Sequence, residues 1–108
     1  MILYGIASCD SCRKARRALD SAGHAVTFRD IRAESLTVAE LERFLAAFGD
    51  RLVNRASATW RALDEVSRAA PLAELIAAHP TVMKRPVIDS GAALHLGWGK
   101  DVQAALLS

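Results

Sequence analysis

The feature that most constrains this chain is a short apolar segment followed by a helix that begins at a cysteine. Residues 2–6 are apolar and have the length of a buried strand. From residue 10 to residue 22 the apolar positions recur at helical spacing, and Gly23 follows where a helix C-terminal cap is expected. Residues 25–30 then alternate like a second strand. Strand, helix and strand in this order predict a βαβ unit, whose two strands run parallel.

Cys9 lies at the turn between the first strand and the helix. The first N–H groups of a helix have no partners within it, so its N-terminus is partly positive and favours a thiolate over a thiol. Four basic side chains within the next two turns add to this field: Arg13, Lys14, Arg16 and Arg17. We therefore expect Cys9 to be the reactive nucleophile.

Cys12 follows Cys9 at a spacing that leaves three roles open. It could resolve a mixed disulfide formed at Cys9, or it could pack inward as a small apolar residue. The third role is a zinc site, but the three histidines of the chain lack the spacing of a zinc finger. We expect no metal and keep Cys12 as a candidate catalytic residue.

The middle of the chain is predicted to be a helical insertion without strands. Thr37 and Glu40 form a capping box ahead of an apolar stripe. A second short helix is expected from Thr59, and a third opens with Pro71 in its first turn and stops at Pro80.

The alternating pattern returns near the end of the chain. Residues 86–89 are predicted to form a strand, residues 90–91 a turn and residues 93–96 its hairpin partner. A final short helix follows, and three of its side chains are expected to face inward: Val102, Ala105 and Leu106. The order βαβ, helical insertion, ββα predicts an α/β, thioredoxin-like fold with a mixed sheet, as one domain over residues 1–108.

In a thioredoxin-like fold a cis proline lies beside the active-site cysteine. Pro86 stands at the entrance to a predicted strand, so it is the candidate for that proline. The alternative is an ordinary trans proline that opens an edge strand.

Composition excludes several classes of function. The length of 108 residues suits one compact domain, and a net charge of +2 is too small to favour nucleic acid as the main partner. The sequence has no apolar run long enough to cross a membrane and no secretory layout at its start. We expect a cytoplasmic monomer, a setting in which a C-x-x-C pair favours redox chemistry over a structural disulfide.

The segment from Leu3 to Arg16 resembles the opening of arsenate-reductase-like proteins, a family of ArsC arsenate reductases, Spx regulators and YffB-type proteins. Further matches are Arg29-Asp30-Ile31, Asn54-Arg55, Thr59-Trp60-Arg61, and His79-Pro80 leading into Lys84-Arg85-Pro86-Val87-Ile88. Together they cover nearly the whole chain, and the pattern looks most like the YffB branch.

The resemblance implies that Cys9 attacks an oxyanion or a disulfide, with Arg85 as the second key residue. Arginine offers paired donors to an anion and keeps its charge at any working pH. Glutathione is implied as a co-substrate and glutaredoxin as a possible partner, with no bound cofactor. Four further residues are expected to bind substrate: Arg55, Pro86, Arg13 and Lys14.

One departure from the family pattern bears on the substrate. Arsenate reductases of this kind carry a further arginine after the hairpin, whereas residues 95–99 here are His-Leu-Gly-Trp-Gly. We therefore expect a glutathione-linked thiol reductase more than an enzyme with strong arsenate turnover. The alternative is an Spx-like regulator that binds RNA polymerase and responds to oxidation of its Cys9 and Cys12 pair.

Overall fold

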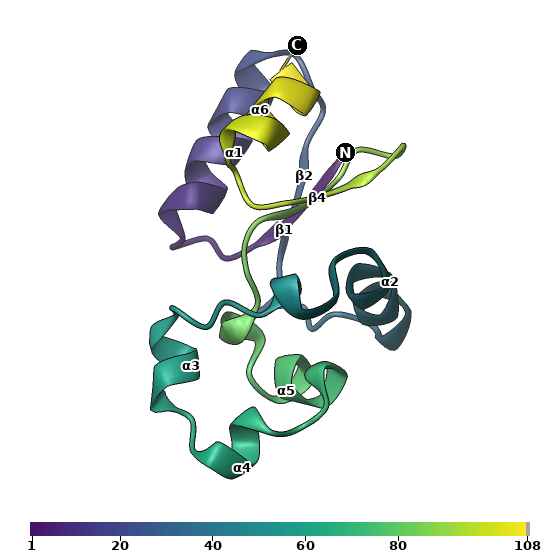
Figure 1. Cartoon of the computed structure of the whole chain (residues 1–108). Coiled ribbons are helices and arrows are strands. Elements are labelled where there is room, and N and C mark those ends of the chain that lie inside the picture. The colour runs from purple at the N-terminus through teal and green to yellow at the C-terminus, as the bar shows by residue number, and fades with distance from the viewer. Residues whose placement is uncertain (108) are drawn as a thin grey trace. The chain divides into compact units, whose positions relative to one another are not determined.

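The structure is a computed structural model that describes residues 1–107. It contains two compact units, whose elements Figure 1 shows in chain order. Unit 1 joins Met1–Glu34 to the segment from Arg85 onward, and unit 2 is Ser35–Lys84. A single domain over the whole chain stays a prediction.

Unit 1 contains a four-stranded mixed sheet of order β2-β1-β3-β4. Its strands are β1 (Ile2–Gly5), β2 (Thr27–Asp30), β3 (Val87–Asp89) and β4 (Leu94–Leu96). β1 runs parallel to β2 and antiparallel to β3, and β3 pairs antiparallel with β4. The predicted βαβ unit and the C-terminal hairpin are confirmed, as is the α/β, thioredoxin-like fold with a mixed sheet.

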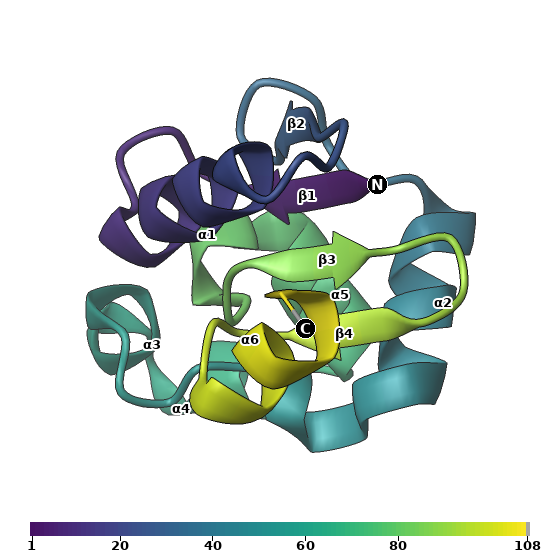
Figure 2. The ribbon, with the colours of Figure 1, turned by 90° about the horizontal axis from the view of Figure 1, so that it is seen from above.

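Helices α1 (Asp10–Ser21) and α6 (Lys100–Leu107) lie side by side over one face of this sheet (Figures 1 and 2). Between them and the sheet lies a core of seven buried residues: Leu3, Cys12, Ala15, Leu19, Ile88, Val102 and Leu106. This core keeps the start of α1 against β1 and β3.

The prediction that Ala105 faces inward is wrong, because its side chain is exposed. Val102 and Leu106 are one helical turn apart and fill the contact with the core. Ala105 lies beyond the edge of this narrow stripe, where a methyl group does not reach the core.

The peptide bond between Arg85 and Pro86 is cis, which confirms the prediction for Pro86. Pro86 is fully buried, and β3 begins at the next residue. The polypeptide therefore enters the central sheet directly after Arg85.

Unit 2 is helical, as predicted. It contains α2 (Val38–Phe48), η1 (Gly49–Leu52), α3 (Ala58–Ala62), α4 (Glu65–Arg68), α5 (Leu72–Ala78) and η2 (Pro80–Val82). The capping box at the start of α2 is confirmed, since the Glu40 N–H donates to Thr37 Oγ1 at 3.1 Å and the Thr37 N–H to Glu40 Oε1 at 2.8 Å. Helix α4 was not predicted, because it has only one turn and no apolar stripe.

Candidate functional site

Cys9 is the N-cap residue of α1, as the sequence predicts. Its backbone is extended, with φ −82° and ψ 124°, and its carbonyl accepts the Arg13 N–H at 3.0 Å. The Cys9 N–H donates to the carbonyl of Ile6 at 3.0 Å, so residues 6–9 form a β-turn that leads from β1 into the helix. The thiol is half-buried at the positive end of a three-turn helix.

The surroundings of Cys9 favour its thiolate. Partial burial raises its pKa, but the N–H and thiol of Cys12 and the guanidinium of Arg85 outweigh that effect, so the pKa of Cys9 lies below its ordinary value. The Cys9 side chain closes no capping hydrogen bond of ordinary geometry, so the Cys12 N–H acts on it as an electrostatic partner. This is the setting of a reactive cysteine.

Cys12 is fully buried in the core of unit 1. Burial, together with the neighbouring Cys9, raises its pKa to about 12, so this thiol stays protonated at neutral pH. A Cβ built on Gly5 would lie 2.4 Å from Cys12 Sγ. The sulfur therefore occupies the space that any other residue at position 5 would need for its side chain.

Arg85 acts on both thiols. Its charge lowers the pKa of Cys9 and opposes the rise in the pKa of Cys12. The structure thus brings together three of the predicted site residues, Cys9, Cys12 and Arg85, with the cis Pro86 directly after the arginine. A cation beside a nucleophilic thiolate can also hold an anionic substrate.

Arg13 and Lys14 are exposed on α1. Arg13 forms an ion pair with Asp10, and both basic residues line a shallow surface pocket next to Asp10 and Arg17. Substrate binding by Arg13 and Lys14 stays a prediction.

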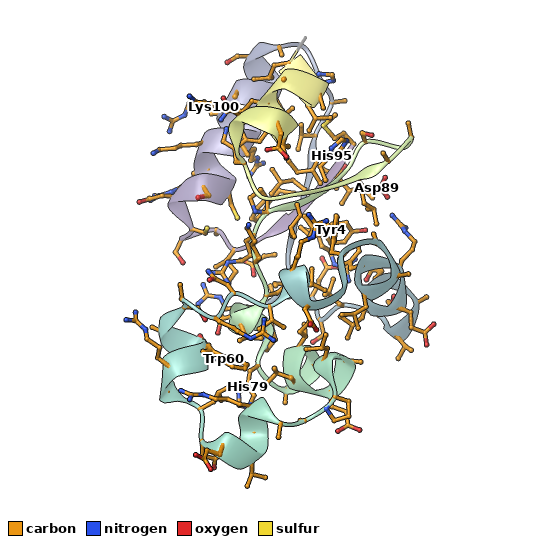
Figure 3. All side chains as sticks on the ribbon, viewed as in Figure 1. Tyr4, Trp60, His79, Asp89, His95 and Lys100 are labelled. Atoms are coloured by element: carbon orange, nitrogen blue, oxygen red, sulfur yellow. The ribbon has the colours of Figure 1, made fainter. Side chains whose placement is uncertain are left out.

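Arg55 belongs to unit 2, where its guanidinium lies over the indole of Trp60 at 5.2 Å from the ring centroid. Arg68 lies over the same ring at 5.4 Å and donates through Nε to the Trp60 carbonyl at 3.1 Å. The position of Trp60 within unit 2 can be followed in Figure 3. A substrate-binding role for Arg55 stays a prediction, and Trp60 is the side chain that stacks against it.

The segment that lacks the family arginine is part of unit 1. His95 pairs with Ile88, so it lies on the sheet face covered by α1 and α6 (Figure 3). Trp98 packs against the buried core, and its carbonyl accepts the Gln103 side-chain N–H at 3.0 Å.

Within residues 1–107, no group of three or more His, Cys, Asp or Glu side chains could hold a metal ion, and no helix is long and apolar enough to cross a membrane.

Two residues near Cys9 were not singled out from the sequence. Gly5 makes room for Cys12, and Asp30 accepts the Ala7 N–H from the turn before Cys9. Asp30 is part of the Arg29-Asp30-Ile31 match to the family, which was the signal available for it. Gly5 was noted only as part of the first strand.

Comparisons with known proteins find relatives that match most of this chain. The chain is 34% identical to an uncharacterised protein of Haemophilus influenzae, over 95% of this chain and 96% of that protein. It is 32% identical to the global transcriptional regulator Spx of Bacillus subtilis, over 92% of this chain and 80% of that protein.

Solved structures are also similar to this chain over most of its length. A YffB protein superposes with a TM-score of 0.90 at 38% identity, over 99% of this chain and 98% of that one. An arsenate reductase (ArsC) related protein of Brucella melitensis superposes with a TM-score of 0.74 at 36% identity, over 95% of this chain and 91% of that one. The sequence profile of the ArsC family matches residues 4–106. This chain belongs to the ArsC family.

Proposed function

We propose that this protein is a cytoplasmic, glutathione-linked thiol reductase in which Cys9 is the nucleophile. The observation that carries the proposal is the placement of Cys9. Cys9 is the N-cap residue of α1, and the guanidinium of Arg85 helps to lower the pKa of its thiol. Membership of the ArsC family, which includes a structure described as arsenate reductase related, supports a reductase.

The proposed reaction exchanges one disulfide for another. The Cys9 thiolate attacks the glutathione sulfur of a glutathionylated substrate; a Cys9–glutathione disulfide forms, and the substrate sulfur leaves as a thiolate that takes a proton. A second glutathione thiolate then attacks the glutathione sulfur, which produces oxidised glutathione and restores the Cys9 thiolate. Arg85 would hold the anionic part of the substrate.

The test is a coupled assay of NADPH consumption with glutathione, glutathione reductase and glutaredoxin. A glutathionylated peptide and arsenate are offered in separate reactions, with and without the protein. Turnover of the peptide above that of arsenate supports a thiol reductase, and the opposite preference would make the protein an arsenate reductase despite residues 95–99. Turnover of neither substrate would contradict the proposal.

Substitution of Arg85 is expected to make Cys9 less acidic. Arg85→Ala removes a cation that lowers the pKa of Cys9, so that pKa should rise by about one unit, and alkylation by iodoacetamide at neutral pH should slow by up to about tenfold. The rate is measured against pH and assigned to Cys9 by mass spectrometry of the peptides.

Two variants separate the causes of this effect. Arg85→Lys keeps the charge but loses the planar fork, so it should restore most of the acidity of Cys9 and little of the anion binding. Lys84→Ala removes the adjacent exposed cation and should leave the alkylation profile in place. An unchanged profile in Arg85→Ala would show that Arg85 does not stabilise the thiolate.

A second candidate function is an Spx-like regulator that binds RNA polymerase. It is favoured by the identity of 32% to the Spx regulator of Bacillus subtilis and by the two free cysteines three residues apart. A pull-down of polymerase subunits with the reduced and the oxidised protein tests it. Binding in one redox state supports a redox-switched regulator, whereas no binding in either state removes this candidate.

A further inference from the structure

The turn that carries Cys9 is attached to the far end of β2. Asp30 is the last residue of β2 and lies opposite Gly5 in the parallel register. Its Oδ2 accepts the N–H of Ala7 at 3.2 Å, a bond that spans 23 residues of sequence. Ala7 is the second residue of the β-turn closed by the Cys9 N–H and the Ile6 carbonyl. The carboxylate therefore holds the turn only two residues before the nucleophile.

The second carboxylate oxygen of Asp30 and its backbone carbonyl also accept hydrogen bonds. Asp30 Oδ1 accepts the N–H groups of Arg32 at 2.8 Å and of Ala33 at 3.3 Å, and the Asp30 carbonyl accepts the Glu34 N–H at 2.9 Å. Such a local turn leaves the aspartate little rotational freedom. Arg32 Nη2 also approaches Ser8 Oγ at 3.5 Å, a weaker second contact with the turn.

These bonds matter because the acidity of Cys9 depends on its position. Its thiolate is stabilised by the first N–H groups of α1 and by the side chain of Arg85, and both effects decline steeply with distance. No covalent link or capping hydrogen bond of the thiol fixes Cys9 at that place. The backbone of the turn is one of the contacts that hold it there, beside the Arg13 N–H bond to its carbonyl and its packing against the core.

We propose that Asp30 is a positioning residue: its carboxylate fastens the Ile6–Cys9 turn to the end of β2 and so fixes Cys9 at the N-terminus of α1. This inference rests on the proposed function in one respect, that Cys9 is the nucleophile. Asp30 itself does not touch the substrate. Its effect reaches the reaction through the Ala7 N–H and the geometry of the turn.

A positioning role and a simple charge effect have opposite signs. Removal of a carboxylate near a thiol stabilises the thiolate, so a pure charge effect would lower the pKa of Cys9. Release of the turn moves the thiolate away from its stabilising partners and raises that pKa. The direction of the shift therefore decides between the two roles. The other charged groups of this region, Arg85, Asp10 and Arg32, are the same in every variant proposed below.

The test measures the alkylation rate of Cys9 against pH in Asp30→Asn. The asparagine oxygen can still accept the Arg32 and Ala33 N–H groups, but its NH₂ then faces the Ala7 N–H, so the local turn survives and the long-range bond is lost. We expect the pKa of Cys9 to rise by about half a unit to one unit, with alkylation at neutral pH slower by about threefold to tenfold.

A second variant breaks the same bond from the other side without any change of charge. Ala7→Pro removes the donated N–H, and the second position of a β-turn is one that proline favours. Like Asp30→Asn, it should raise the pKa of Cys9. Circular dichroism and thermal unfolding identify any variant that fails to fold. If Asp30→Asn does not fold, Ala7→Pro decides alone.

The control is Asp20→Asn, which makes the same change of charge at an exposed position near the end of α1. It should leave the profile of Cys9 unchanged. An unchanged or lowered pKa of Cys9 in the folded variants would overturn the positioning role of Asp30. Alkylation needs no substrate, so that outcome is distinguishable from failure of the proposed reductase activity.

Discussion

Cys9→Ser should reduce disulfide reductase turnover by about a thousandfold or more, because a serine hydroxyl does not ionise near neutral pH and the thiolate is the attacking group. The fold should survive, since Cys9 is half-buried at a helix cap, where serine is a favoured residue. The measurement is the coupled NADPH assay, accompanied by a thermal unfolding curve of each variant. Full activity in a folded Cys9→Ser protein would contradict the proposed mechanism.

The pH dependence of turnover should report the same group. Attack requires the thiolate, so the rate falls as the pH drops through the pKa of Cys9 in the free enzyme. Because the Cys12 N–H, the Cys12 thiol and Arg85 together outweigh burial and lower that pKa, activity should persist at pH values where an ordinary thiol is protonated. In Arg85→Ala the low-pH limb of the profile should move to higher pH.

Cys12→Ser separates the two ways of completing the cycle. If glutathione resolves the Cys9 mixed disulfide, turnover continues in this variant and depends on the glutathione concentration. If Cys12 resolves it, the Cys12 thiol forms a disulfide with Cys9 and releases one glutathione in a single turnover without added glutathione, and Cys12→Ser abolishes this release. The buried position and the raised pKa of Cys12 favour glutathione, because a protonated thiol is a poor nucleophile.

The order of the elements could be predicted because each one carries a local signal. The βαβ unit follows from a change of apolar period, and α2 follows from the Thr37–Glu40 capping box. The one-turn helix α4 has only its own N-cap, in which the Asp64 side chain accepts the Ser67 N–H at 2.7 Å. Many loops also contain one such capping hydrogen bond, so a cap without a periodic apolar pattern does not predict a helix.

Only those parts of the candidate site that carry a local sequence signal or a fold analogy could be predicted. Cys9 is found by its place before a helix, and the cis bond at Arg85-Pro86 agrees with the fold analogy. The contact of Asp30 with Ala7 and that of Gly5 with Cys12 depend on how the parallel strands and α1 approach each other. Hydrophobic periodicity indicates which face is buried, but it does not give the distance between two backbones.

Gly5→Ala is expected to destabilise the protein. The new Cβ would lie 2.4 Å from Cys12 Sγ, 3.2 Å from Cys12 Cβ and 3.3 Å from Leu3 Cδ2, all in the buried core. Overpacking of this kind costs about 1–3 kcal/mol, whereas the reduced freedom of the unfolded chain returns only about 0.4–1 kcal/mol. The overlap should therefore dominate, and Tm should fall by several degrees in a thermal unfolding experiment.

The cause of this loss can be isolated with a double variant. Cys12→Ala removes the sulfur that the new methyl group meets, so Gly5→Ala/Cys12→Ala should be more stable than the sum of the two single changes predicts. Gly99→Ala is the matched control: its Cβ would meet only Asp101 Oδ1, at 2.9 Å, the far end of an exposed side chain that can turn away. If Gly5→Ala were as stable as Gly99→Ala, or if Cys12→Ala gave no compensation, the close contact between β1 and α1 would not be what requires glycine at position 5.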